Sequence, residues 1–340
     1  MKKIGVLGAG TWGMALARML SNNGHSVTVW SAIGQEIDSM SQTRRHQNLP
    51  GMEIPGQIRF TKDMETVCKD MDILLFAVPS PFVRATARKA APYVSDGQII
   101  VDVAKGIEAD TLYTMTRIIA EEVGNPCVPL VALSGPTHAE EVAKDLPTTI
   151  VSASDNSAAA QVVQQVFGGT CMRVYTNDDT LGVELCGALK NIIALASGIA
   201  LGLGYGDNTK AALITRGIAE IARLGEAMGC RPETFGGLAG IGDLIVTATS
   251  VHSRNNRCGM LIGKGVPPQD AVKQVGMVVE GINALPAAMR LSQVYQVEMP
   301  IVAAVNAVVN EGAAPEDTVA MLMGRDQKAE LPASALHNRY

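Results

Sequence analysis

Residues 2–20 read KKIGVLGAGTWGMALARML, and this stretch decides the fold of the first half of the chain. A short apolar run leads into the pattern GxGxxG, formed by Gly8, Gly10 and Gly13, and a helix-like run follows it. In a strand–turn–helix unit the first glycine permits a tight turn, the second lets the backbone approach a pyrophosphate, and the third allows helix and strand to pack closely. The N–H groups at the helix N-terminus also attract an anion. The stretch therefore predicts a dinucleotide site, with a purely structural glycine turn as the alternative.

The composition is that of a two-domain protein with small ligands. The chain has 340 residues, of which 47% are hydrophobic and 18% charged, with a net charge of −5. This length is enough for two cores. Because no basic run exceeds Arg44-Arg45, we expect neither nucleic acid nor a membrane surface as a partner. Without a cleavage-site pattern or an uncharged apolar run of membrane-spanning length, the sequence predicts a cytoplasmic protein with no membrane anchor. The six cysteines are scattered without a CxxC pair, which indicates neither a disulfide nor a metal site.

Short apolar runs alternate with helical segments through the first half of the chain. Nearly continuous apolar runs, typical of strands buried on both faces, occur at 26–30, 72–78, 98–103, 128–133, 148–152 and 172–175. Helical segments such as 82–91 and 111–123 separate most of them, as parallel crossovers require. We therefore predict an α/β fold with an N-terminal, Rossmann-like, doubly wound and mostly parallel sheet.

The alternation stops near Asp178, and the rest of the chain reads as helices. This change predicts a dinucleotide-binding domain at 1–178 and an all-helical substrate domain at 179–340. Within the second half, the helix predicted at 209–229 carries an apolar stripe and a separate polar stripe of Arg216, Glu220 and Arg223. The final residues, 327–340, read as a polar tail.

Lys190 is an anomaly in the first helix of the second half. The run 184–199, ELCGALKNIIALASGI, is otherwise largely apolar. Helical spacing places small residues on the face beside the lysine, namely Gly187, Ala194, Ser197 and Gly198. This arrangement predicts empty volume that a ligand can fill. The alternative is a lysine that snorkels to water past a close contact between two helices.

Three predicted strands end in residues that are unusual for a core. They are followed by Val78-Pro79-Ser80, Ala104-Lys105-Gly106 and the run SGPT at 134–137. In an open α/β sheet, ligands bind beyond the carboxyl ends of the strands. Lys105 is therefore a candidate ligand-facing cation, with an exposed loop lysine as the alternative.

The end of the second predicted strand departs from the usual NAD pattern. An acid is expected there for the ribose hydroxyls, but Trp30 is followed by Ser-Ala-Ile and the first acid is Glu36. Loss of that acid favours NADP, yet no arginine stands at the strand end to bind a 2′-phosphate. Arg44 and Arg45 read as solvated loop charges, with a loop that folds back to the strand end as the alternative. The sequence leaves the choice between NAD and NADP open.

Two motifs in the second half contain candidate binding groups. The first, GGLAGIGD at 236–243, ends in the carboxylate of Asp243, and the second is HSRNNR at 252–257. Ser253 can cap the helix that follows, which leaves Arg254, Asn255 and the first-turn N–H groups as a candidate phosphate site. Taken alone, each motif is also explained by a structural role.

Ten short motifs together resemble one enzyme family. The sequences GAGTWG, NLPG, VPS, AKG, SGPTHAEE, GALKN, NTKAALITRG, GLAGIGDL, HSRN and VVEG occur in the same order in bacterial NAD(P)-dependent sn-glycerol-3-phosphate dehydrogenases. The resemblance covers nearly the whole chain, and residues 31–33 are its one clear departure. It implies reversible hydride transfer between NAD(P)H and dihydroxyacetone phosphate, giving sn-glycerol 3-phosphate for glycerophospholipid synthesis.

The resemblance also implies roles for particular residues. Lys190 would exchange the proton at the C2 oxygen, with its pKa lowered by desolvation and by Lys105, and Asp243 would orient Lys190 or a substrate hydroxyl. Besides these catalytic residues, the substrate-binding set is Lys105, Gly135, Thr137, Ser253, Arg254 and Asn255. The cofactor contacts beyond the glycine turn are Thr11, Trp12, Lys105, Ala139, Arg254, Val278 and Glu280.

Two other classes of protein stay open at this point. One is another two-domain NAD(P)-dependent hydroxyacid dehydrogenase, of the 3-hydroxyacid or 6-phosphogluconate type. The other is a nucleotide-sensing protein without catalysis, although an intact set of Lys190, Asp243 and Arg254 argues against it. The sequence does not decide whether the chain forms a homodimer, nor whether it is regulated by feedback or closes its domains around ligands.

Overall fold

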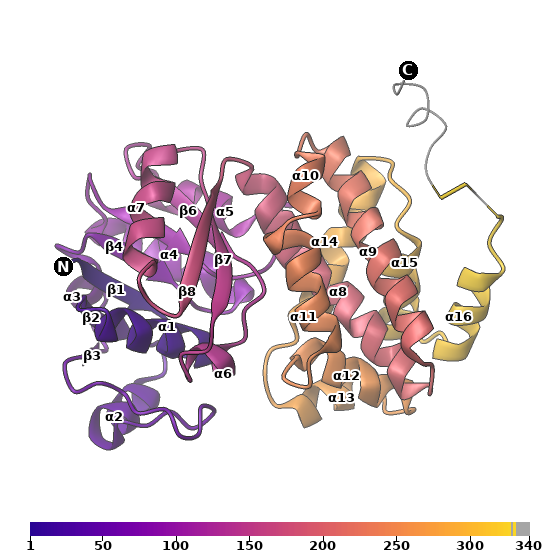
Figure 1. Ribbon diagram of the computed structural model, residues 1–340, viewed down its shortest axis with the longest axis horizontal. Helices are drawn as coiled ribbons and strands as arrows, with labels where there is room; N and C mark the ends of the chain where they lie inside the picture. Colours follow the sequence, from indigo (N-terminus) through magenta and orange to yellow (C-terminus); the bar gives the residue numbers. More distant parts are fainter. Residues whose placement is uncertain (328, 331–340) are drawn as a thin grey trace.

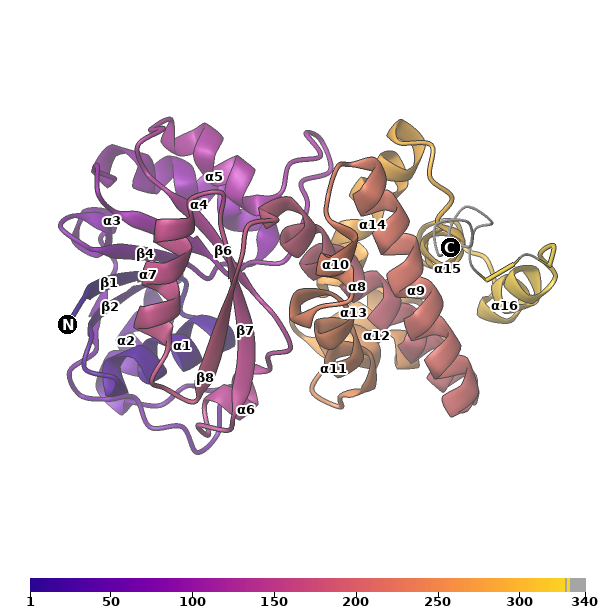
Figure 2. The same ribbon diagram turned by 45° about the horizontal axis from the view of Figure 1, so that its top comes forward.

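The computed structural model describes residues 1–327 and 329–330. An α/β part and a helical part lie side by side (Figures 1 and 2), the first in indigo to magenta and the second in pink-red through orange to yellow. The predicted polar tail lies outside the described residues at 328 and 331–340. The combination of a mostly parallel sheet and a helical second half confirms the predicted fold class.

The α/β part contains an eight-stranded sheet in the order β3-β2-β1-β4-β5-β6-β7-β8. Neighbouring strands are parallel except for β6 and β7, which are antiparallel. The strands are β1 (Lys3–Leu7), β2 (Ser26–Trp30), β3 (Arg59–Thr61), β4 (Ile73–Phe76), β5 (Ile99–Asp102), β6 (Leu130–Ser134), β7 (Thr148–Ala153) and β8 (Met172–Asn177). The prediction missed β3, because a three-residue strand at the sheet edge carries no apolar run.

Helices connect these strands and then form the second half. The first group is α1 (Thr11–Asn22), α2 (Gly34–Thr43), α3 (Met64–Cys68), η1 (Ser80–Phe82), α4 (Val83–Ala90), η2 (Ala91–Tyr93), α5 (Met115–Val123), α6 (Ala139–Val142) and α7 (Ser157–Phe167). The second group is α8 (Thr180–Gly202), α9 (Asp207–Ala227), α10 (Pro232–Phe235), η3 (Leu238–Gly242), α11 (Asp243–Thr249), α12 (Arg254–Gly263), α13 (Pro268–Val275), α14 (Glu280–Val294), α15 (Pro300–Asn310) and α16 (Pro315–Met323).

The helix predicted at 111–123 begins four residues later than expected, at Met115. Leu112 has a left-handed backbone with φ of 61°, and Ile107 pairs with Thr114 in an isolated antiparallel bridge. Residues 103–114 are therefore a folded loop between β5 and α5 rather than a crossover helix. This loop carries Lys105.

Alternate residues of the central strands pack on opposite sides of the sheet. In β4, Ile73 and Leu75 belong to one apolar core with α1 and α7, whereas Leu74 and Phe76 belong to a second core with α4 and α5. A strand buried on both faces has this alternation. Because helices cover both faces of the sheet, ligands can bind at the carboxyl ends of the strands.

Helix α8 runs through the centre of the helical part (Figure 1) and is buried almost all round. It is long and apolar enough to cross a membrane, but 89% of its most apolar window is buried inside the fold, as in a core helix. A Cβ on Gly198 would lie 2.1 Å from the carbonyl oxygen of Asn256 in α12. The predicted empty volume is therefore absent at Gly198, because the backbone of α12 fills it.

The sequence analysis placed Glu220 on a polar stripe of the helix that is α9, and the structure buries this residue. Its side chain is 2% exposed, and it accepts hydrogen bonds from the backbone N–H groups of Ile301 (2.9 Å) and Val302 (3.4 Å). These donors begin α15, so the carboxylate satisfies helix-end N–H groups that have no partner within the helix. Burial raises the pKa of Glu220 to about 7.

Candidate active site

The glycine turn between β1 and α1 has the geometry that a dinucleotide requires. Gly8 has φ of 125°, and a Cβ there would lie 2.7 Å from backbone atoms of Ala77. A Cβ on Gly13 would lie 2.1 Å from the carbonyl oxygen of Gly8, so helix and strand are in close contact. At Gly10 the space is open, since an added Cβ would meet nothing within 4 Å. The turn is closed toward the protein and open toward solvent at its second glycine.

Three of the other cofactor residues predicted from the resemblance lie on α1 or on the helix packed against it. Thr11 and Trp12 are the first residues of α1, both partly exposed, and Ala139 begins α6, which packs against α1. A residue that the sequence analysis did not single out, His46, lies with its Nε2 3.2 Å from the carbonyl oxygen of Ala9. Burial lowers the pKa of His46.

Two lysines and one carboxylate meet between the α/β part and the helical part. Lys190 Nζ lies 2.7 Å from Asp243 Oδ1, and Lys105 Nζ lies 2.7 Å from Asp243 Oδ2. Lys105 also donates to the carbonyl oxygen of Gly135, at 3.3 Å. Three sequence-distant segments therefore form one charge cluster, which carries two positive charges and one negative charge when all three groups are ionised. Such a cluster favours an anionic ligand.

The local backbone places Asp243 at the centre of this cluster. The segment before it, η3, contains a kink at Gly240, where a Cβ would lie 2.1 Å from the carbonyl oxygen of Phe235. The kink ends at Asp243, the first residue of α11, whose side chain is fully buried. Since an acid in the first turn interacts favourably with the helix dipole, α11 supports the ionised carboxylate.

Lys190 is buried rather than snorkelling to water, since it is only 4% exposed. Its ammonium donates to Thr247 Oγ1, and Thr247 Oγ1 donates in turn to the carbonyl oxygen of Asp243 at 2.7 Å. Burial lowers the pKa of Lys190 to about 7, Asp243 opposes this shift and Lys105 reinforces it. The amine can therefore gain or lose a proton near neutral pH. The sequence analysis missed Thr247, although it lies one helical turn after Asp243.

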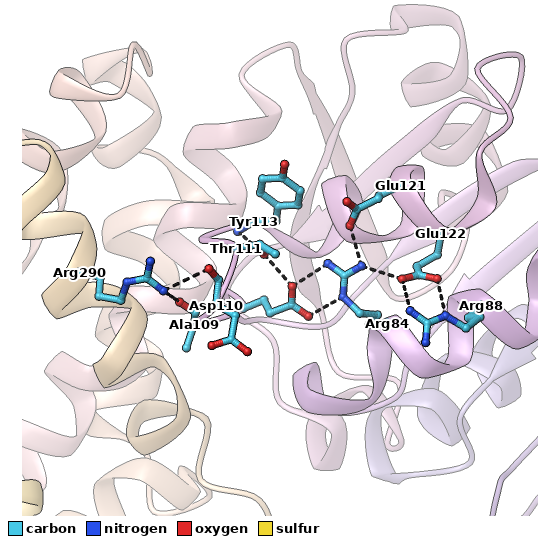
Figure 3. A network of polar contacts seen from close by, with 10 residues as sticks. Arg84, Arg88, Ala109, Asp110, Thr111, Tyr113, Glu121, Glu122 and Arg290 are labelled. Atoms are coloured by element: carbon cyan, nitrogen blue, oxygen red, sulfur yellow. Dashed lines mark hydrogen bonds and ion pairs between the residues drawn. The ribbon is translucent and has the colours of Figure 1, made fainter.

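An ion-pair network holds the loop that carries Lys105 on its α/β side (Figure 3). Arg84 of α4 donates two hydrogen bonds to the carboxylate of Glu108, at 2.7 and 2.6 Å. The same guanidinium reaches Glu121 at 2.6 Å and Glu122 at 2.7 Å on α5. Because a bidentate arginine–carboxylate pair fixes orientation as well as distance, Glu108 ties the loop to two helices.

The helical part holds the same loop from the other side. Arg290 of α14 donates to the carbonyl oxygens of Ala109 and Asp110, the second at 3.2 Å (Figure 3). Ile107 packs within the apolar core of the helical part, together with residues of α8 and α14. The Lys105 loop is therefore held between the two parts, next to the charge cluster.

A second connection between the parts joins Ser80 and Glu280. The backbone N–H of Ser80 donates to Glu280 Oε1 at 3.1 Å, and its hydroxyl donates to Oε2 at 2.6 Å. Ser80 follows β4 and Glu280 begins α14, with Val278 two residues earlier and partly buried. Glu280, like Lys105, is thus a residue predicted to contact the cofactor that is already bonded across the two parts.

The motif at 252–257 is placed at the start of α12. Ser253 caps this helix, as expected, by accepting a hydrogen bond from the N–H of Asn256 at 3.2 Å. Asn255 donates to Asn191 at 2.9 Å and accepts from the N–H of Gly281 at 2.8 Å, so its side chain joins α8, α12 and α14. Both the amino group and the carbonyl oxygen of this side chain are therefore hydrogen-bonded within the protein.

The structure brings only some of the predicted substrate residues into direct contact. Lys105, Lys190 and Asp243 form the charge cluster, and both Lys105 and Thr137 donate to the carbonyl oxygen of Gly135, at 3.3 and 3.2 Å. Among the described residues, no hydrogen bond or ion pair links Ser253 or Arg254 to this cluster.

The 252–257 motif nevertheless approaches the loop that follows β6. The rings of His138 and His252 have centroids 5.9 Å apart, one ring from each segment. Ser134, the first residue of the run at 134–137 that the sequence analysis singled out, ends β6. Its buried hydroxyl has no hydrogen-bond partner among the described residues, and it lies 3.2 Å from the position of a Cβ on Gly187.

Both halves of the chain match family models. Residues 3–160 match the NAD-dependent glycerol-3-phosphate dehydrogenase N-terminus, and residues 179–320 match the C-terminus of the same family. The chain belongs to the NAD-dependent glycerol-3-phosphate dehydrogenase family. This finding confirms the resemblance seen in the sequence motifs.

Individual members of the glycerol-3-phosphate dehydrogenase family are similar over nearly the full length. A glycerol-3-phosphate dehydrogenase [NAD(P)+] of Lactobacillus delbrueckii subsp. bulgaricus is 66% identical, covering 97% of this chain and 99% of its own. The Agathobacter rectalis relative of that name is 52% identical, with coverage of 97% and 98%. The crystal structure of glycerol-3-phosphate dehydrogenase from Coxiella burnetii has a TM-score of 0.91 at 36% identity and covers 95% of this chain and 99% of that one.

Proposed function

We propose that this member of the family interconverts dihydroxyacetone phosphate and sn-glycerol 3-phosphate with NAD(H) or NADP(H). The single observation that carries this proposal is the buried Lys190–Asp243–Lys105 cluster, which lies between a dinucleotide turn and a helical half. A buried lysine with a pKa near 7 is suited to proton exchange at neutral pH. A neighbouring second cation is suited to a phosphate-bearing substrate.

The residues around the glycine turn fit a dinucleotide. The open space at Gly10 admits a pyrophosphate close to the backbone, and α1 presents its first N–H groups there. Gly8 and Gly13 cannot carry a side chain without a backbone clash. Thr11, Trp12, Ala139, Val278 and Glu280, with Lys105 and Arg254, remain the proposed cofactor contacts. When bound, the nicotinamide supplies or takes up the hydride.

We assign the proton transfer to Lys190. In the reductive direction C2 of the ketone gains a hydride, and the C2 oxygen takes a proton from the Lys190 ammonium. In the oxidative direction the neutral amine takes that proton back. Asp243 holds the ammonium in position at 2.7 Å and balances one of the two positive charges. Lys105, Gly135, Thr137, Ser253, Arg254 and Asn255 are the proposed substrate residues, with Asn255 positioned to act through Asn191.

Absorbance at 340 nm with NADH or NADPH and dihydroxyacetone phosphate tests the proposed reaction directly. Turnover of this ketone, and none of 3-hydroxyacid or 6-phosphogluconate substrates supplied with NAD+ or NADP+, is the expected result. Cofactor binding without turnover of any of them would instead indicate a nucleotide-sensing protein.

Two further assignments go with this function. We propose a boundary between residues 178 and 179, since β8 ends at Asn177 and α8 begins at Thr180. We also propose a cytoplasmic location, supported by six cysteines that are all free thiols in the described structure.

A further inference from the structure

The end of β2 lies directly beside the glycine turn. The backbone N–H of Gly8 donates to the carbonyl oxygen of Trp30 at 2.9 Å, so the residue after Trp30 lies next to the first glycine. In dinucleotide-binding folds this position faces the ribose of the adenosine, and an acid there binds its 2′-hydroxyl. The residue in this chain is Ser31, which is 8% exposed.

Ser31 brings a carboxylate to this position from five residues further along. Its hydroxyl donates to Glu36 Oε2 at 3.0 Å and accepts from the N–H of Ile33 at 3.1 Å. Glu36 lies in the first turn of α2 and is exposed. Its negative charge also acts on His46, which contacts the carbonyl oxygen of Ala9 in the turn. The strand end therefore has an acid that the linear sequence does not place there.

Two cations near this position already have partners, and one of them, Lys62, lies with its Nζ 3.6 Å from the position of a Cβ on Gly34 at the start of α2. Lys62 Nζ pairs with Asp38 Oδ2 at 2.7 Å, and Arg44 donates to the carbonyl oxygen of Ile58 at 2.9 Å. Arg44 also lies over the ring of Phe60, 5.5 Å from its centroid. A 2′-phosphate at the end of β2 would thus meet the carboxylate of Glu36, while Lys62 and Arg44 are held by these contacts.

We propose that Glu36, held at the end of β2 by Ser31, makes this enzyme prefer NAD(H) over NADP(H). The inference rests on the proposed cofactor site at the glycine turn. The carboxylate accepts a hydrogen bond from the ribose 2′-hydroxyl of NAD(H) and repels the 2′-phosphate of NADP(H). This preference for NAD(H) is opposite to the preference for NADP that the missing acid at the end of β2 suggested.

Direct binding titrations of NADH and NADPH, read from nicotinamide fluorescence without the second substrate, test this proposal. For Glu36→Gln we expect NADH binding to weaken by about tenfold, the loss of one charged hydrogen bond, and NADPH binding to tighten by a similar factor. Ser31→Ala keeps the charge of Glu36 but removes the hydrogen bond that holds its carboxylate. The cofactor preference of this variant should therefore lie between those of the wild type and Glu36→Gln. The kcat/KM values with the two cofactors should follow the same order.

Glu65→Gln is the matched control, since it removes an equal charge from a surface pair with Lys69. It should leave both dissociation constants unchanged. The proposal is overturned if the wild type binds NADPH more tightly than NADH, or if Glu36→Gln leaves their ratio within about twofold of the wild type. Failure of the wild type to bind either cofactor would instead overturn the proposed cofactor site, and this inference with it.

Discussion

Lys190 and Asp243 form a fully enclosed ion pair, with Lys190 Nζ 2.7 Å from Asp243 Oδ1, although 52 residues of chain separate them. Asp243 has a second cation, Lys105, on its other oxygen at 2.7 Å. Burial and the second cation make the Lys190 ammonium easier to deprotonate, while the carboxylate retains it. The pair therefore keeps the pKa of Lys190 near neutral pH, where the lysine can donate a proton in one reaction direction and accept it in the other.

Opposite pH dependences of the two reaction directions follow from this pKa. Reduction needs the ammonium, so its kcat/KM should fall as pH rises through about 7, where the pKa of free Lys190 lies. Oxidation needs the neutral amine, so its kcat/KM should rise over the same range. Initial rates in both directions between pH 5.5 and 9 would be measured, as about this window brackets the transition. Parallel profiles in the two directions would contradict the role of Lys190.

Replacement of Lys190 should remove the proton transfer without removing the cofactor site. We expect Lys190→Met to lower kcat by roughly 10² to 10⁴-fold, the usual contribution of a positioned acid or base. The dissociation constant of NADH, measured by fluorescence, should stay close to that of the wild type. Lys69→Met is a matched control, since this lysine pairs with Glu65 on the surface. Nearly normal turnover of Lys190→Met would assign the proton to another group.

Asp243→Asn should shift the pH profile in the acidic direction. Asp243 raises the pKa of Lys190, so its loss should lower that pKa further and reduce the ammonium fraction at pH 7. The falling limb of the reductive profile is then expected at lower pH than in the wild type. Asp178→Asn removes an exposed carboxylate that pairs with Arg231 and should leave the profile in place. A limb unchanged in Asp243→Asn would show that it reports another group.

The hydrogen bonds between Ser80 and Glu280 should stabilise the arrangement of the two parts. Ser80→Ala removes the 2.6 Å hydroxyl contact, which is worth about 1.5 to 3 kcal/mol for a charged acceptor. We expect faster hydrogen exchange around residues 278–282 and a lower kcat/KM for the cofactor. Ser292→Ala is the control on the same helix, because its hydroxyl bonds locally to Met289. Equal exchange in Ser80→Ala and the wild type would exclude this role.

Arg290 should position Lys105 through the loop between β5 and α5. Loss of its bonds to the carbonyl oxygens of Ala109 and Asp110 is expected to raise the KM for dihydroxyacetone phosphate in Arg290→Met. The pH limb set by Lys190 should not move, since Arg290 bonds the loop and not the ammonium. Arg325→Met, which breaks a surface pair with Glu298, serves as the control. A shift of the pH limb would show that Arg290 acts on the charge cluster itself.

Gly198→Ala should destabilise the protein through overpacking. The added Cβ would lie 2.1 Å from the Asn256 carbonyl oxygen, so α8 and α12 must move apart. We expect a loss of about 1 to 3 kcal/mol in the free energy of unfolding, measured by denaturant titration. Gly56→Ala meets nothing within 4 Å and should change the stability far less. Equal stabilities of the two variants would mean that the helices separate at no cost.

The dinucleotide turn and the strands of the central sheet were predictable from the sequence because their signals are local. A glycine pattern between a strand and a helix requires only neighbouring residues, and an apolar run reports burial on both faces. The strand β3 and the loop at 103–114 were not predictable in the same way, since edge position and a left-handed residue at Leu112 leave no periodic pattern.

Lys190 stood out in the sequence as a charge in an apolar helix, but the sequence allowed both a snorkelling side chain and a catalytic one. Only the tertiary structure shows that Lys190 is buried and ionisable there, because Asp243 comes from a distant segment to stabilise its charge. Likewise, the composition of the β2 end showed no acid, and folding of α2 returned Glu36 to it. The sequence alone determines residue types and local periodicity, whereas charge pairing and solvent exclusion depend on which distant segments meet in the fold.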